Sequence, residues 1–143
     1  MKPSHSLMQF LRTGLYAGLV AAVLNILIYL VITSIGGYGW AAVILVSILV
    51  ASLLPNLLAA LAYFGLSYVT SKARLLLAIG VTVFVLISVL PHLGIGPAPS
   101  PALSMLPEGF DIITVPLHIV FGLTAIFVMP WLLARSSPSI VEE

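Results

Sequence analysis

The chain has 143 residues, of which 62% are hydrophobic and 6% are charged, and its formal net charge is +1. A soluble domain carries about 25% charged residues, so this composition excludes an ordinary water-soluble protein and predicts a membrane protein. The near-neutral charge offers no basic surface for nucleic acid. The absence of cysteine excludes disulfides, thiol catalysis and thiolate metal sites.

Four apolar runs predict four membrane-spanning helices within one domain. Each run approaches or exceeds the roughly 20 residues that a helix needs to cross the hydrocarbon core. The first run is longer than the apolar core of a signal peptide, about 7–15 residues, so we expect it to be retained. The predicted fold is an all-α membrane protein, an antiparallel up-down bundle of four transmembrane helices. Within the domain, 1–143, we place the spans at about 13–35, 40–69, 74–93 and 112–134, and a long loop at 94–111.

The basic residues predict the orientation of these spans. Lys2 and Arg12 precede the first span, Lys72 and Arg74 separate the second from the third, and Arg135 follows the fourth. With four crossings all five lie on one side of the membrane, and the positive-inside rule assigns that side to the cytoplasm. We therefore expect a multi-pass protein of the plasma membrane with both termini cytoplasmic, which makes the long loop extracytoplasmic.

Polar residues near the middle of the spans form a predicted structural polar core. Pro55 lacks an N–H group and so leaves the carbonyl of Ala51 without its helical donor, and Asn56 follows directly. Asn25 lies at a similar depth in the first span, so we expect the two amides to pair. Such bonds average about 0.6 kcal/mol and fix register more than they add stability. Ser88 completes this core, and the alternative is that the amides line a path for a substrate or an ion.

Small residues predict where the helices approach closely. Gly14 and Gly18 form a Gly-xxx-Gly pair in the first span, and Gly122 lies one turn after His118 in the fourth. Residues of this size at this spacing let helix backbones come together. We expect the three glycines to pack helices within the chain, and the alternative for the first pair is a dimer contact.

Two histidines are the candidate ligand-binding residues. His92 lies at the outer end of the third span, and His118 lies about two turns below the outer boundary of the fourth, which places His92 shallower by roughly one turn or more. Neutral imidazole is a common axial ligand, so His118, with or without His92, is the predicted site for haem or a chlorophyll-type pigment. The alternatives are a proton relay, a metal ligand or a hydrogen-bonded interfacial histidine. A closed zinc site needs about four ligands, so no metal site is predicted.

Three stretches of the sequence resemble an uncharacterised bacterial four-pass integral membrane family. Residues 53–61 resemble its Leu-Leu-Pro-x-Leu-Leu-Ala-Ala motif, residues 86–92 are similar to its third-helix ending, and residues 117–120 are similar to its fourth-helix Met-His-Leu-Val. The resemblance covers about residues 14–135 and implies four passes, with Pro55, Pro91 and His118 in matching places. It implies no activity, and this chain departs from the family in a shorter first outer loop.

These features favour a structural or accessory subunit that associates with itself or with a larger membrane complex. The alternatives are a haem- or pigment-binding protein that uses His118 and His92, or a small transporter or channel formed by an oligomer. No carboxylate lies within the predicted spans, which disfavours proton-coupled transport. We expect no enzymatic activity, because no nucleophile–base motif is present. The expected partners are the lipid bilayer and other membrane subunits or a second copy, not nucleic acid.

Overall fold

The computed structural model describes residues 5–37, 43–95 and 110–136, and within them the chain is all-α. Most of the predicted loop at 94–111 lies outside the described residues, as does the start of the span predicted at residue 40. The helical elements are α1 (Leu7–Gly36), α2 (Val43–Val69), α3 (Ala73–Val89), the 3₁₀ turn η1 (Leu90–Leu93), α4 (Asp111–Leu123), the π-helical segment η3 (Thr124–Val128) and α5 (Met129–Arg135).

Four helical stretches among the described residues are long and apolar enough to cross a membrane. Only 17% to 39% of the most apolar part of each stretch is buried inside the molecule. The exposed remainder is largely leucine, isoleucine and valine, a surface that hydrocarbon accommodates and water does not. The predicted all-α fold with four apolar helices is thus confirmed, and it supports a multi-pass membrane protein. The four stretches are Leu7–Gly36, Ile44–Val69, Ala73–Leu93 and Ile112–Arg135.

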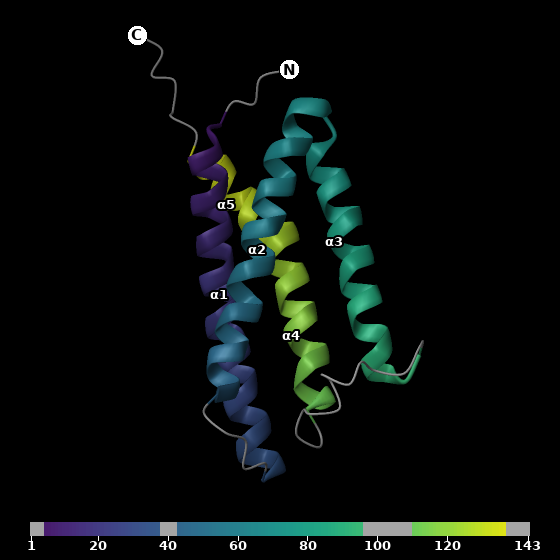
Figure 1. The fold of residues 1–143 in the computed structure, drawn as a ribbon. Helices are drawn as coiled ribbons and strands as arrows, with labels where there is room; N and C mark the ends of the chain where they lie inside the picture. Colours follow the sequence, from purple (N-terminus) through teal and green to yellow (C-terminus); the bar gives the residue numbers. More distant parts are fainter. Residues whose placement is uncertain (1–4, 38–42, 96–109, 137–143) are drawn as a thin grey trace.

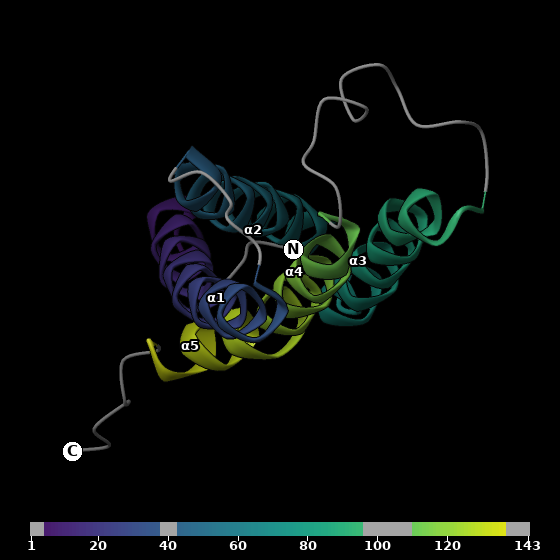
Figure 2. The ribbon, with the colours of Figure 1, turned by 90° about the horizontal axis from the view of Figure 1, so that it is seen from below.

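Consecutive helices run in alternating directions, as Figure 1 shows. The start of α1, the turn between α2 and α3, and the end of α5 lie at one end of the molecule, which we call the basic end (Figure 1). Seen along the helices, α1, α2 and α4 form a compact group and α3 stands at its edge (Figure 2). Accordingly α3 is the least buried span, at 17%.

A capping box explains why α1 begins before the predicted span. The hydroxyl of Ser6 accepts a hydrogen bond from the backbone N–H of Gln9, and the Gln9 side chain accepts one from the backbone N–H of Ser6. This exchange satisfies donors that a helix start leaves unpaired. The helix therefore starts at Leu7 instead of about residue 13, and Arg12 is an exposed residue within it. Its other end is closed by Gly37, whose φ of 67° suits glycine.

The last span changes its winding just before a proline. The backbone N–H of Met129 donates to the carbonyl of Thr124, five residues back, which makes η3 a π-helical turn. Pro130 follows directly, and it can neither donate a hydrogen bond nor tolerate a carbonyl in the normal position four residues back. Proline and π turns are the usual causes of such a break in a long helix.

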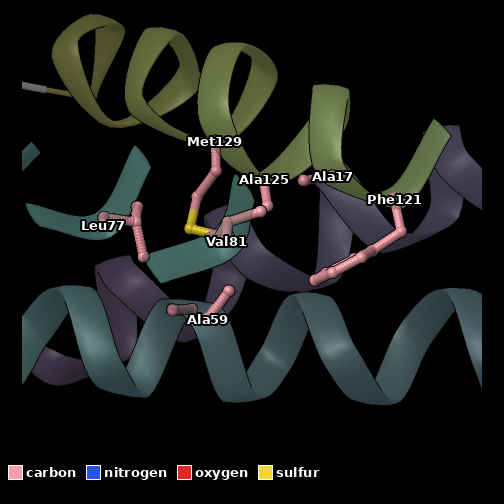
Figure 3. Close-up of a cluster of buried hydrophobic side chains, with 8 residues drawn as sticks. Ala17, Ala59, Leu77, Val81, Phe121, Ala125 and Met129 are labelled. Atoms are coloured by element: carbon pink, nitrogen blue, oxygen red, sulfur yellow. The ribbon is translucent and has the colours of Figure 1, made fainter. Parts of the chain in front are cut away.

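A buried apolar cluster joins all four spans (Figure 3). Its members on α1 and α2 are alanines, and the larger side chains come from α3 and from the last span. Because lipid tails are as apolar as this cluster, close packing of small residues holds the helices together more than hydrophobic burial does. The cluster comprises Ala17, Ala59, Ala60, Leu77, Val81, Phe121, Ala125 and Met129.

Two glycines let α1 lie directly on α2. A Cβ atom added at Gly14 would come 2.6 Å from the Cβ of Ala60 and 2.9 Å from the carbonyl oxygen of Asn56. One added at Gly18 would lie 3.0 Å from the Cα of Leu53. A larger residue at either position would push the two backbones apart. In this structure the Gly-xxx-Gly pair is therefore used within the chain.

Candidate functional site

Four buried polar side chains meet where α1, α2 and η3 come together. Asn25, Ser52, Asn56 and Thr124 are each at most 3% exposed, and we call them the central polar cluster. All four are neutral at physiological pH, so the cluster can position helices through hydrogen bonds but offers no acid or base for chemistry. Polar groups at such positions in a membrane protein are costly unless they are paired.

Ser52 receives hydrogen bonds from both asparagines of the cluster. The amide nitrogen of Asn25 donates to the Ser52 hydroxyl oxygen at 3.0 Å. The amide nitrogen of Asn56 donates to the Ser52 backbone carbonyl at 2.9 Å. The direct amide pair expected from the sequence is therefore wrong. Helical side chains lean toward the N-terminus of their own helix, so in two oppositely directed helices the asparagines lean toward each other and meet Ser52 between them.

Thr124 connects the last span to this cluster at the first residue of the π turn. Its hydroxyl lies 2.9 Å from the carbonyl oxygen of Phe121 and 3.4 Å from the amide oxygen of Asn56. A hydroxyl has one hydrogen, so the shorter contact takes it and the contact to Asn56 is the weaker one. The sequence analysis did not single out Thr124. Its signal is the position six residues before Pro130, at the start of a turn that the proline disturbs.

The cluster contains one amide oxygen without a donor. The Oδ1 atom of Asn25 is buried and has no hydrogen-bond partner among the described residues. A buried acceptor left unpaired costs about 1–3 kcal/mol, more than the average membrane hydrogen bond contributes. The cluster therefore fixes the register of α1 against α2 at some expense in stability.

The two histidines form a pair at the end of the molecule opposite the basic end. Their ring centroids are 6.0 Å apart, with the ring planes inclined by 41°. The expectation that His92 lies a turn or more above His118 is therefore wrong. His92 belongs to the 3₁₀ turn that ends the third span, and His118 leans toward the start of α4, so the two rings converge.

A hydrogen bond fixes the tautomer of His118. Its Nδ1 atom lies 2.8 Å from the backbone carbonyl oxygen of Thr114, and a carbonyl can only accept, so Nδ1 carries the hydrogen. The Nε2 atom then keeps its lone pair. Histidines that ligate metals commonly have this arrangement, with the other ring nitrogen donating to a carbonyl. Among the described residues no three His, Cys, Asp or Glu side chains gather as a metal site.

The remaining predicted site residues lie outside the central polar cluster. Ser88 donates to the carbonyl of Phe84 on its own helix and is half-buried, so the structure does not bring it to the asparagines. Pro55 is half-buried inside the continuous helix α2. Gly122 is buried against α3, where an added Cβ would come 2.9 Å from a methyl carbon of Val85.

An open groove runs between α2 and α3, and we call it the lateral groove. It has a volume of about 390 Å³ and an almost entirely apolar lining. Pro55, Ala59, Ala62 and Gly80 line it together with larger leucine and phenylalanine side chains. An added Cβ at Gly80 would meet no atom within 4 Å, so packing inside the chain does not require a glycine there.

Comparisons with family models, curated proteins and solved structures find no match to this chain. The resemblance of its motifs to an uncharacterised bacterial family therefore stays a prediction. The described structure supports a small integral membrane protein with four apolar helices, without identifying its family.

Proposed function

We propose that this protein is a structural or accessory membrane subunit that binds a transmembrane helix of another subunit along the lateral groove. The observation that carries the proposal is the groove itself, which lies between two spans at the least buried side of the bundle. Its small residues are of the kind that lets helix backbones approach each other, whereas an acyl chain needs no such residues.

The interior of the bundle also supports a structural role. The central polar cluster is closed, with no member more than 3% exposed, and it contains no titratable group. A transporter needs polar groups along an accessible path, and proton coupling usually needs a carboxylate among them. A cluster that is sealed and neutral suits a rigid scaffold that presents its outer surface to a partner.

We also propose that the basic end faces the cytoplasm and that the protein resides in the plasma membrane. Arg12, Lys72, Arg74 and Arg135 all belong to this end of the described chain. Clusters of Lys and Arg next to membrane spans are retained on the cytoplasmic side.

Site-specific crosslinking in intact membranes tests the proposed association, and the lack of cysteine makes it clean. Gly80→Cys places a single thiol in the groove, and Gly65→Cys places one on α2 outside it. The two glycines are matched, because both are exposed and an added Cβ at either would meet no atom within 4 Å. With a short bis-maleimide and thiol-bearing partners, or with copper-catalysed oxidation, Gly80→Cys should give a discrete adduct and Gly65→Cys should not.

The mass of that adduct distinguishes a second copy of the chain from a different subunit, and either supports the proposal. Adducts of equal yield from both positions would indicate random collision and contradict it. A Gly80→Leu variant should also lose the association measured by native electrophoresis, whereas Gly65→Leu should keep it. If both variants keep it, the groove is not the contact.

The histidine pair favours a second candidate function, binding of haem or a chlorophyll-type pigment. The supporting observation is the proximity of the His92 and His118 rings together with the free lone pair on His118 Nε2. The purified protein would then show a Soret or pigment absorption band that disappears in His118→Ala. A colourless protein expressed with cofactor supplied would remove this candidate.

A further inference from the structure

A second hollow lies on the other side of α3, at the basic end of the molecule. It has a volume of about 450 Å³ and lies between the start of α3 and the π segment η3 of the last span. The two hollows use different faces of α3, because the positions that line this one are offset around the helix from those that line the lateral groove. Its lining residues are Ser71, Lys72, Arg74, Leu75, Ala78, Ile126 and Phe127.

The lining of this hollow is divided into a cationic rim and an apolar wall. Lys72 and Arg74 lie at the end of the third span, where a membrane helix reaches the headgroup layer. Leu75 and Ala78 follow them along α3 into the span, and Phe127 faces them from η3. Cation at the interface and hydrocarbon below it is the pattern that a phospholipid presents in reverse.

The two cations of the rim are not neutralised by the described part of the chain. Lys72 and Arg74 are exposed, and the first turn of α3 contains no acidic residue. Arg135 at the same end differs, because its guanidinium carbon lies 3.9 Å from the centre of the Trp131 ring. An anion between Lys72 and Arg74 would meet two positive charges without displacing an internal partner.

We propose that this hollow binds an anionic phospholipid. The phosphate lies between Lys72 and Arg74, and one acyl chain follows the apolar wall past Leu75 and Phe127. Basic hollows between transmembrane helices on the cytoplasmic side are suited to such headgroups. A lipid is favoured over a soluble phosphate because the hollow continues from its cationic rim into a wall that faces the membrane. The inference is independent of the proposed partner helix, which occupies the other face of α3.

Spin-labelled lipids in phosphatidylcholine vesicles test this proposal with the full chain. The fraction of spin-labelled phosphatidylglycerol immobilised by the protein should exceed that of spin-labelled phosphatidylcholine. The variant Lys72→Gln/Arg74→Gln should weaken this preference by roughly fivefold for each charge removed. The matched control is Arg12→Gln/Arg135→Gln, which removes two charges from the same end of the molecule but none from the hollow, and it should keep most of the preference.

Three outcomes would overturn the proposal. Equal loss in the two double variants would mean that surface charge alone attracts the lipid. Equal immobilisation of the two lipids by the unmodified protein would mean that no anionic site exists. Release of the labelled phosphatidylglycerol by inorganic phosphate in the buffer, at constant ionic strength, would mean that the hollow binds a free anion instead of a lipid.

Discussion

At two positions of α1 a single hydrogen atom is the side chain, and the contact with α2 depends on it. The Cα of Gly14 faces the carbonyl of Asn56, and the Cα of Gly18 faces the backbone near Leu53. Close approach of this kind permits weak Cα–H···O contacts as well as dense packing. In a solvent that provides no hydrophobic drive between helices, such contacts supply much of the association.

Gly14→Ala should therefore destabilise the protein relative to Gly65→Ala. Both substitutions gain the helix preference of alanine, about 1 kcal/mol, so this contribution cancels in the comparison. Only the Cβ at Gly14 clashes, with Ala60 and the Asn56 carbonyl, and overpacking of this kind costs about 1–3 kcal/mol. Unfolding of the two variants by SDS titration in mixed micelles measures the difference. Equal unfolding free energies would mean that the α1–α2 contact is looser than described.

The bond between Asn25 and Ser52 gives a second prediction at this scale. In a double-mutant cycle, Asn25→Leu and Ser52→Ala should be coupled by about 0.6 kcal/mol and by no more than about 1.7 kcal/mol. A control cycle of Asn25→Leu with Ser88→Ala should be additive within about 0.3–0.5 kcal/mol, because Ser88 bonds to its own helix. Additivity in both cycles would contradict the described hydrogen bond.

At the scale of single elements, the π turn of the last span is the most unusual feature. A π turn holds one residue more than the α-helical turn it replaces, so its hydrogen bonds span five residues instead of four. The extra residue places the Thr124 hydroxyl beside Asn56 while the helix continues into α5. The turn thus connects the end of the bundle to its polar centre.

Deletion of Phe127 from the π turn should consequently be tolerated better than deletion of Ile119 from α4. Both side chains are exposed to lipid, at 58% and 48%, so the loss of their own contacts is similar. Removing Phe127 lets the turn become α-helical with its flanks in place. Removing Ile119 rotates the start of α4 by about 100° against its neighbours. Size-exclusion profiles and thermal midpoints in detergent compare the two, and equal damage would contradict the role assigned to the π turn.

The sequence predicted these elements better than their contacts. Span lengths follow from apolar runs, which need no knowledge of neighbours, and the depth of Asn25 and Asn56 follows from their place in the runs. Their shared partner Ser52 was missed because it depends on the direction in which helical side chains lean. The depth of His92 was wrong because its helix ends in a 3₁₀ turn. The lateral groove depends on the edge position of α3, which no local pattern encodes.

For the whole molecule, the central division is between a closed part and an open part. The helices α1, α2 and the last span enclose the polar cluster and most of the alanine-rich core. The third span covers one side with few buried residues and leaves a hollow on each of its flanks. A rigid body with one loosely held edge suits a subunit that works through association in the membrane.

The orientation of this body in the membrane gives the last prediction. Arg12, Arg74 and the other described basic residues lie at one end, so the energy of retaining positive charge in the cytoplasm acts in one direction only. Single cysteines at Ser71, Ser136 and Ser104 can report the outcome, because the chain has no other thiol. In intact cells a membrane-impermeant maleimide should label Ser104→Cys, in the loop between the last two spans, and should reach Ser71→Cys and Ser136→Cys only after permeabilisation. Labelling of Ser71→Cys in intact cells would reverse the topology, and it would also place the lipid site proposed at Lys72 in the outer leaflet.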